Sequence, residues 1–134
     1  MITEDYVSFE TAKLLKEKGF EGYSILTIYD ENAANAYIKE LKEKHLPYCS
    51  DDPKLKEFYY TRPTLQMACK WLVREHRLYV NVAPSVEGYY WTEKWHSYVE
   101  DLNKRYPSGR FISTLNSPEE ACEVAIKYCL ENLI

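Results

Sequence analysis

Glycine is scarce in this chain, and its scarcity excludes the common phosphate-binding loops. None of the 4 glycines among the 134 residues belongs to a glycine-rich run. Dinucleotide and triphosphate sites need several closely spaced glycines, because only then can the backbone approach the phosphate oxygens. The sequence also lacks the Gly-x-Ser-x-Gly turn of serine hydrolases and the His-Glu-x-x-His zinc motif. We therefore expect no cofactor and no catalytic residue, and we predict that the protein is not an enzyme.

The cysteines and histidines are few, and they lie in none of the spacings that bind metals. The chain has 4 cysteines and 3 histidines, with no Cys-x-x-Cys pair and no short Cys/His spacing. Three of the cysteines fall in helical patterns among Ala, Leu and Ile, where a free thiol behaves as a small apolar side chain. We predict reduced thiols and no metal site. These residues are Cys49, Cys69, Cys122, Cys129, His45, His76 and His96.

Long apolar runs and a basic excess are absent as well. No run approaches the ~20 apolar residues of a membrane-spanning helix. The acidic segment 1–5 has no apolar stretch of the kind found in secretory signals, so we expect a cytoplasmic protein with no membrane association. The formal net charge of −4 counts against nucleic-acid binding, which usually relies on a basic surface, but it leaves room for a local basic patch.

Three segments carry the periodicity and the end signals of helices. Ser8 suits an N-cap and Gly19 suits the C-terminal turn of the first. Pro63 suits the first turn of the second, because its missing N–H costs nothing there. Residues 117–120, Ser-Pro-Glu-Glu, form a capping box that begins the third. The predicted helices are residues 8–18, 63–76 and 117–134.

Residues 31–46 admit two interpretations. They follow a predicted strand over 23–30, which is rich in β-branched and aromatic residues. Tyr37 and Leu41 fit one face of a helix, and several alanines favour that structure. In the alternative, the first residues of the segment form a turn and residues 35–41 return as a second strand. Local propensity favours the helix only slightly, so both interpretations stay open.

The remaining strands are predicted from β-branched and aromatic residues and from the breakers between them. Pro84 would end one strand, because proline cannot donate to a sheet ladder. Gly88 would lie in a hairpin between two others. Strands joined in this way, together with three helices, predict an α+β fold in which an antiparallel sheet has about three helices packed on one face, in one domain spanning 1–134. The predicted strands are 58–60, 78–83, 91–99 and 111–113.

Tyrosine and tryptophan are abundant, and one cluster of them is the candidate binding patch. The chain has 13 Tyr, 4 Phe and 3 Trp. A sheet covered by helices on one face leaves its other face open to water, and exposed apolar patches on such a face usually mark a partner. Tyr and Trp are also frequent at binding hot spots. The predicted patch consists of Tyr89, Tyr90, Trp91, Trp95 and Tyr98.

Three segments resemble a known group of proteins. Residues 6–20 (YVSFETAKLLKEKGF), 63–76 and 119–134 (EEACEVAIKYCLENLI) are similar to a family of short proteins of unknown function from gut Bacteroidales genomes, including Bacteroides, and from their phages or prophages. Together they cover about a third of the chain. The resemblance implies a phage or mobile-element context and a shared helical framework, and it implies a turn into a second strand after Asn32. It implies no activity and no site residue.

These features support three hypotheses about function, taken in order. The first is a non-enzymatic accessory protein that binds another protein or associates with itself through the aromatic strands. The second is a nucleic-acid-binding protein in which aromatic rings stack on bases while Lys104, Arg105 and Arg110 contact phosphates. The third is a small enzyme, which would need polar groups that converge in a cleft.

Overall fold

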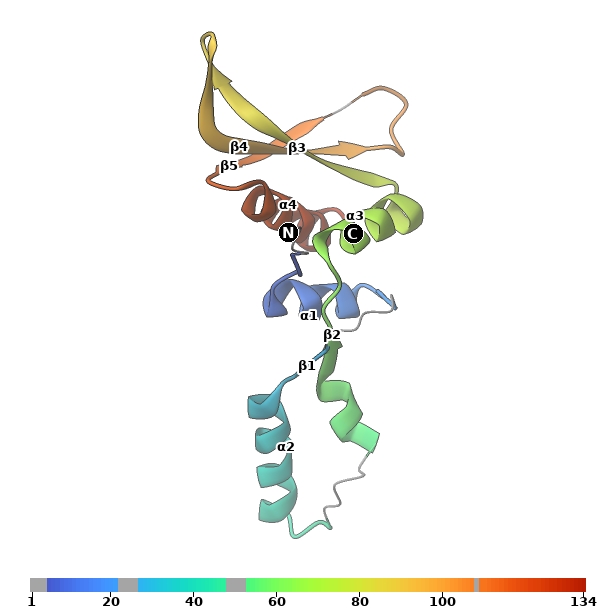
Figure 1. The fold of residues 1–134 in the computed structure, drawn as a ribbon. Helices are drawn as coiled ribbons and strands as arrows, with labels where there is room; N and C mark the ends of the chain where they lie inside the picture. The colour runs from blue at the N-terminus through green and yellow to red at the C-terminus, as the bar shows by residue number, and fades with distance from the viewer. Residues whose placement is uncertain (1–4, 22–26, 48–52, 108) are drawn as a thin grey trace.

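In the computed structural model, a sheet and its helices form a layered body from which a narrower arm extends (Figure 1). The structure describes residues 5–21, 27–47, 53–107 and 109–134. In chain order, the elements are α1 (Phe9–Glu17), β1 (Thr27–Tyr29), α2 (Glu31–Glu43), the 3₁₀ helix η1 (Pro53–Phe58), β2 (Tyr59–Thr61), α3 (Leu65–Trp71), the π-helical turn η2 (Leu72–His76), β3 (Leu78–Glu87), β4 (Tyr90–Asp101), β5 (Arg110–Leu115) and α4 (Pro118–Asn132). The α+β class is therefore confirmed.

The main sheet is antiparallel and has the strand order β3–β4–β5. Because directly opposed residues of antiparallel strands share a face, the register separates a covered face from an open one. Val80 lies opposite Val99, and Ser97 lies opposite Ser113. Val99 and Ser97 are buried, and the Ser97 and Ser113 hydroxyls hydrogen-bond at 2.7 Å. These residues define the face that α4 covers.

The helices lie on one side of this sheet, in layers. Helix α4 contacts all three strands, and α1 packs against α4 from behind (Figure 1). The core between them contains Leu15 of α1, Leu72 of η2, and Ile126 and Leu130 of α4, each with no exposed surface. Fully burying such a side chain contributes roughly 1.5–3 kcal/mol. The apolar stripes predicted along the three helices thus meet in one core.

The arm holds α2 and η1 away from that core. Strands β1 and β2 pair antiparallel and connect the arm to the body (Figure 1). Within the arm, Ala34 and Leu55 are buried, and the Tyr37 and Phe58 rings lie 6.0 Å apart. These side chains form a small satellite cluster, so α2 leaves most of its surface in solvent.

The open question about residues 31–46 is resolved in favour of the helix. Asp30 is the N-cap of α2, and its carboxylate accepts a hydrogen bond from the Ala33 backbone N–H at 3.1 Å. Thus the second strand over 35–41, which the family resemblance implied, is wrong for this chain. Of the strand predicted over 23–30, Thr27–Tyr29 is confirmed, while 22–26 lie outside the described residues.

Two proline predictions need correction. Pro84 does not end its strand: β3 continues to Glu87, with a shift in register between Pro84 and Val86. Proline is tolerated there because β3 is an edge strand, whose outward N–H groups have no ladder partner to lose. Pro63 precedes the helix rather than beginning it, since the Thr64 hydroxyl caps α3 by accepting the Met67 N–H at 3.2 Å.

Candidate binding surface

The β3–β4 hairpin extends beyond the helices that cover the rest of the sheet (Figure 1). Glu87 pairs with Tyr90, so only Gly88 and Tyr89 form the turn. Gly88 has φ +63°, a left-handed conformation that glycine adopts without a steric penalty. A positive φ at only the first of two turn residues is the pattern of a type II′ hairpin, which matches the twist of its strands. The hairpin predicted around Gly88 is confirmed.

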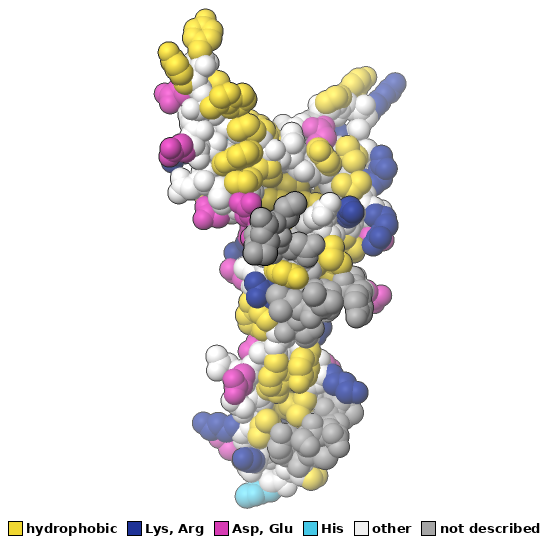
Figure 2. All heavy atoms as spheres, in the orientation of Figure 1, with side chains coloured by type: hydrophobic (Ala, Val, Ile, Leu, Met, Phe, Trp, Pro, Cys, Tyr) yellow, Lys and Arg dark blue, Asp and Glu magenta, His cyan; other side chains and the backbone are white. Residues whose placement is uncertain are grey.

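The far end of this hairpin exposes large apolar side chains. Tyr89 is 99% exposed, Tyr90 80%, Trp91 71% and Val86 50%. We call these four residues the hairpin surface. Figure 2 shows hydrophobic side chains running in a column from the tip of the hairpin towards the body. No helix reaches this end of the hairpin, and its rings are therefore left in water (Figure 1).

The hairpin surface is apolar on both sides of the ribbon. Val86 lies opposite Trp91, and both belong to the face that α4 covers further along the strands. Tyr90 lies opposite Glu87 on the other face. A flat partner would cover only one of the two faces. A groove that receives the ribbon would cover both.

The other two residues of the predicted patch lie elsewhere. Trp95 is half-buried on the covered face, opposite Pro84 and Leu115. Tyr98 is half-buried on the open face, where its ring lies 5.7 Å from that of Phe111. The five aromatic residues predicted as one patch thus divide between the hairpin tip and two faces of the sheet.

The open face of the sheet carries a second aromatic cluster. The rings of His96, Tyr98 and Phe111 contact one another edge to face, with centroids 5.4–6.1 Å apart. A hydrogen bond of 2.8 Å between His96 Nδ1 and the Thr114 hydroxyl fixes the imidazole in this cluster. Phe111 is 54% exposed and was absent from the predicted patch. Its strand was predicted as only residues 111–113, which is too short for alternation to reveal which face Phe111 occupies.

The three basic residues predicted to contact phosphates do not share one face. Arg110 lies opposite Val99 on the covered side, and its guanidinium donates a hydrogen bond to the Tyr128 hydroxyl of α4. Lys104 and Arg105 are exposed in the loop between β4 and β5, where the Arg105 guanidinium lies 5.7 Å from the Tyr106 ring. Arg110 is therefore separated from the ring cluster of the open face.

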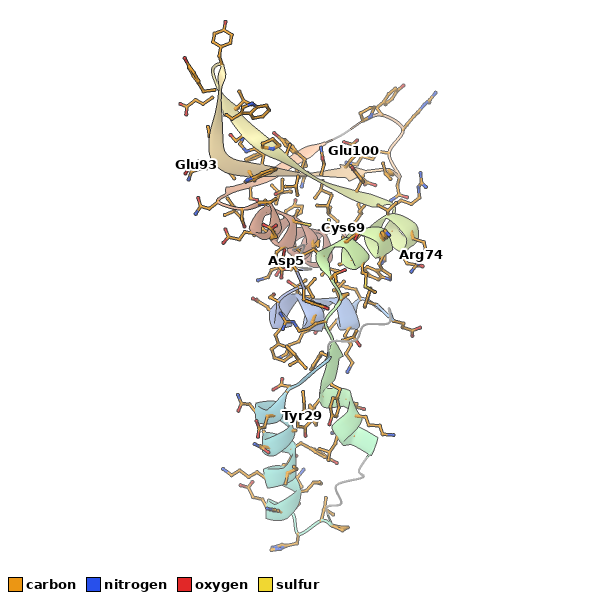
Figure 3. The ribbon with its side chains drawn as sticks, viewed as in Figure 1. Asp5, Tyr29, Cys69, Arg74, Glu93 and Glu100 are labelled. Carbon is orange, nitrogen blue, oxygen red and sulfur yellow. The ribbon has the colours of Figure 1, made fainter. Side chains whose placement is uncertain are left out.

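A cavity of about 300 Å³ lies between α3–η2 and the β3 edge. Its lining includes Cys69, Lys70, Val73, Arg74 and Tyr79. Figure 3 shows Cys69 and Arg74 on the same helical segment below the sheet. Among the described residues, no group of three or more His, Cys, Asp or Glu side chains is arranged to hold a metal ion.

None of the helices in the described part of the chain has the length and apolar character needed to cross a bilayer. Comparisons with protein families, with curated proteins and with solved structures find no match to this chain. The functional argument therefore rests on the geometry of the chain itself.

Proposed function

We propose that this protein is a non-enzymatic binding protein that inserts the β3–β4 hairpin into a groove on a partner polypeptide. The observation that supports this proposal is the exposure of Tyr89, Tyr90 and Trp91 on a hairpin that no helix covers. Apolar side chains on both sides of the ribbon favour a partner that surrounds the hairpin over one that packs on a flat face.

The size of the hairpin surface fits a specific interface. An aromatic side chain buries about 150–250 Å², so three rings with these exposed fractions leave roughly 500 Å² in water. A standard interface buries about 800 Å² on each partner. The hairpin surface would thus supply more than half of one side. At about 25 cal/mol per Å² its burial yields on the order of 10 kcal/mol, from which the cost of association must be subtracted.

The charges around the hairpin favour a polypeptide over a nucleic acid. Glu87 and Glu93 flank the rings, Lys94 is the adjacent cation, and the chain has a formal net charge of −4. Carboxylates beside the rings would repel phosphates, whereas a protein groove with mixed polar groups would tolerate them. The resemblance of the chain to phage and prophage proteins makes a phage or host protein the heterologous partner to test, and a second copy of this chain is the first self-association to test.

Light scattering on a size-exclusion column tests the proposal, with purified protein alone and then with fractionated host extract. We expect a dimer or a discrete complex. Replacing Tyr90 and Trp91 together with serine should weaken that assembly at least tenfold. The matched control is Tyr106→Ser, which removes a ring of 72% exposure from the loop between β4 and β5. Equal weakening by the control, or a strict monomer with no partner, would contradict insertion of the hairpin.

Single-stranded nucleic acid is the second candidate, and the ring cluster on the open face favours it. Rings such as Tyr98 and Phe111 can stack on bases, and Lys104 and Arg105 lie in an adjoining loop. Binding of a labelled oligonucleotide should then decrease with salt and with Phe111→Ala, while the Tyr90/Trp91 double variant keeps full affinity. Absence of binding at low salt would remove this candidate.

A further inference from the structure

Two cysteines that are 53 positions apart in the sequence meet between α3 and α4. The sulfur atoms of Cys69 and Cys122 lie 3.6 Å apart, within the range of a thiol hydrogen bond. Both side chains are partly accessible, whereas the third described cysteine, Cys129, is fully buried. The pair is therefore distinct from a thiol that only fills space in the core.

Cys69 has a route to solvent and a cationic surrounding. It lines the cavity of about 300 Å³ between α3–η2 and the β3 edge, so a small molecule entering that cavity meets its sulfur. The side chains of Lys70 and Arg74 line the same cavity. Positive charge beside a thiol favours the thiolate, which is the nucleophilic form.

The two thiols differ in their tendency to lose a proton. A hydrogen bond from the Cys122 thiol lowers the pKa of Cys69, since it stabilises the thiolate. The same hydrogen bond and burial raise the pKa of Cys122, and the carboxylates of Glu119 and Glu123 on its own helix add to that rise. Burial raises the pKa of Cys129 to about 12, which keeps this thiol protonated and unreactive. Cys69 is therefore the attacking sulfur, and Cys122 is the partner that holds the proton.

We propose that Cys69 and Cys122 form a redox-active dithiol, in which Cys69 reacts with a hydroperoxide that enters the cavity and Cys122 then closes a disulfide between α3 and α4. In the first step, the Cys69 thiolate attacks the distal oxygen of ROOH. The S–O bond forms as the O–O bond breaks, and the leaving alkoxide takes a proton from water to give ROH. Cys69 becomes a sulfenic acid, so sulfur is oxidised and the peroxide is reduced.

In the second step, the Cys122 sulfur attacks the sulfur of the Cys69 sulfenic acid. The S–S bond forms as the S–O bond breaks, and the departing hydroxide combines with the proton of Cys122 to leave as water. A disulfide bond is about 2.05 Å long, so the sulfurs must approach by roughly 1.5 Å, a movement on the scale of small side-chain rotations. The product ties α3 to α4 and removes the thiol from the cavity wall.

Hydrogen peroxide treatment of the full-length protein, followed by mass spectrometry of its peptides, tests this proposal. We expect the chain to lose the mass of two hydrogens and to yield one cross-linked peptide pair containing Cys69 and Cys122. Dithiothreitol should reverse both changes. The oxidised protein should unfold at a higher urea concentration, because the link constrains the unfolded chain. Cys129→Ser should behave like the unaltered chain.

Two variants assign the roles of the two sulfurs. In Cys122→Ser, dimedone should trap a sulfenic acid at Cys69, because no second thiol can resolve it. In Cys69→Ser, Cys122 should stay unmodified at the same peroxide concentration. A cross-link through Cys49 or Cys129 in the unaltered chain would overturn the proposal. So would irreversible oxidation of Cys69 with no link to Cys122, or no reaction at concentrations that oxidise a free cysteine.

Discussion

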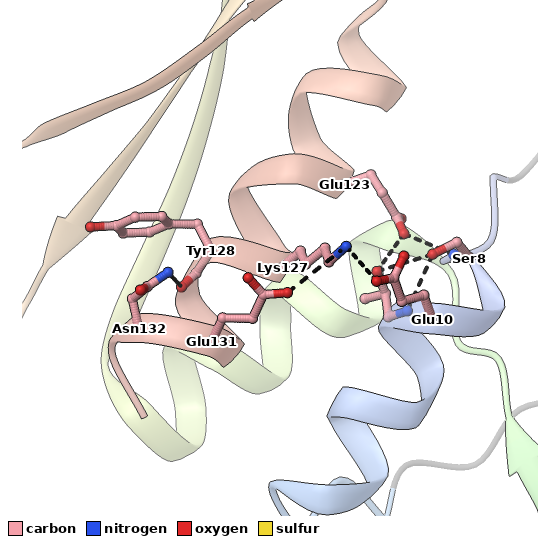
Figure 4. A network of polar contacts seen from close by, with 8 residues as sticks. Ser8, Glu10, Glu123, Lys127, Tyr128, Glu131 and Asn132 are labelled. Atoms are coloured by element: carbon pink, nitrogen blue, oxygen red, sulfur yellow. Dashed lines mark hydrogen bonds and ion pairs between the residues drawn. The ribbon is translucent and has the colours of Figure 1, made fainter.

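Replacing Glu123 with alanine should separate α1 from α4 at the point where the first helix begins. The Glu123 carboxylate accepts two hydrogen bonds from α1, one from the Ser8 backbone N–H at 2.9 Å and one from the Thr11 hydroxyl at 2.6 Å (Figure 4). A carboxylate at a helix N-terminus also faces the positive end of the helix dipole. Glu123 thus acts as a cap supplied by a different helix.

The expected loss follows from these contacts. A hydrogen bond to a charged group contributes about 1.5–3 kcal/mol, and the half-buried position of Glu123 places each bond near the lower limit. The Thr11 side chain is fully buried, so its hydroxyl hydrogen would lose its acceptor without gaining water. We expect Glu123→Ala to lower the free energy of unfolding by about 2–3 kcal/mol. With a urea m-value of about 2 kcal/mol/M, the midpoint would fall by roughly 1 M.

Urea unfolding followed by circular dichroism provides the measurement, and Glu131→Ala is the matched control. Glu131 lies on the same helix and is exposed, and its 3.8 Å contact with Lys127 contributes below about 0.5 kcal/mol. A double-mutant cycle with Thr11→Val should show coupling between Thr11 and Glu123. If Glu123→Ala matches the control, or if the cycle is additive, the inter-helix cap does not stabilise the fold.

Two further predictions concern the arm and the hairpin. The hydrogen bond from the Ala33 backbone and the 3.0 Å pair with Lys13 lower the pKa of Asp30. Its stabilising contribution should therefore be complete above about pH 4 and disappear as the pH falls through the folded-state pKa. Helical circular dichroism should show this acid loss in the unaltered chain, and an identical acid profile in Asp30→Asn would count against it. For Gly88, with φ +63° and open space around the position of a Cβ atom, alanine should cost about 1–2 kcal/mol in urea unfolding. Asparagine, which tolerates this conformation better, should cost less, and equal losses would show that the turn relaxes.

Local signals in the sequence determined where most elements begin and turn. Ser8 and Ser117 each accept a hydrogen bond from the backbone N–H three residues ahead, as their positions before apolar periodic segments predicted. Gly88 forms the predicted hairpin because glycine pays no steric penalty for a positive φ. These features depend on neighbours within a few residues, and such neighbours are visible in a linear sequence.

Other features depend on elements distant in the sequence, and only the tertiary structure decided them. Pro84 lies within a strand because β3 is at the edge of the sheet. Trp91 and Trp95 share a face by alternation, yet Trp91 is exposed and Trp95 is half-buried, because the helices cover the sheet only as far as its middle. The approach of Cys69 to Cys122 requires the packing of α3 on α4. Alternation assigns a residue to a face, but the length and position of a packed helix decide whether that face meets protein or water.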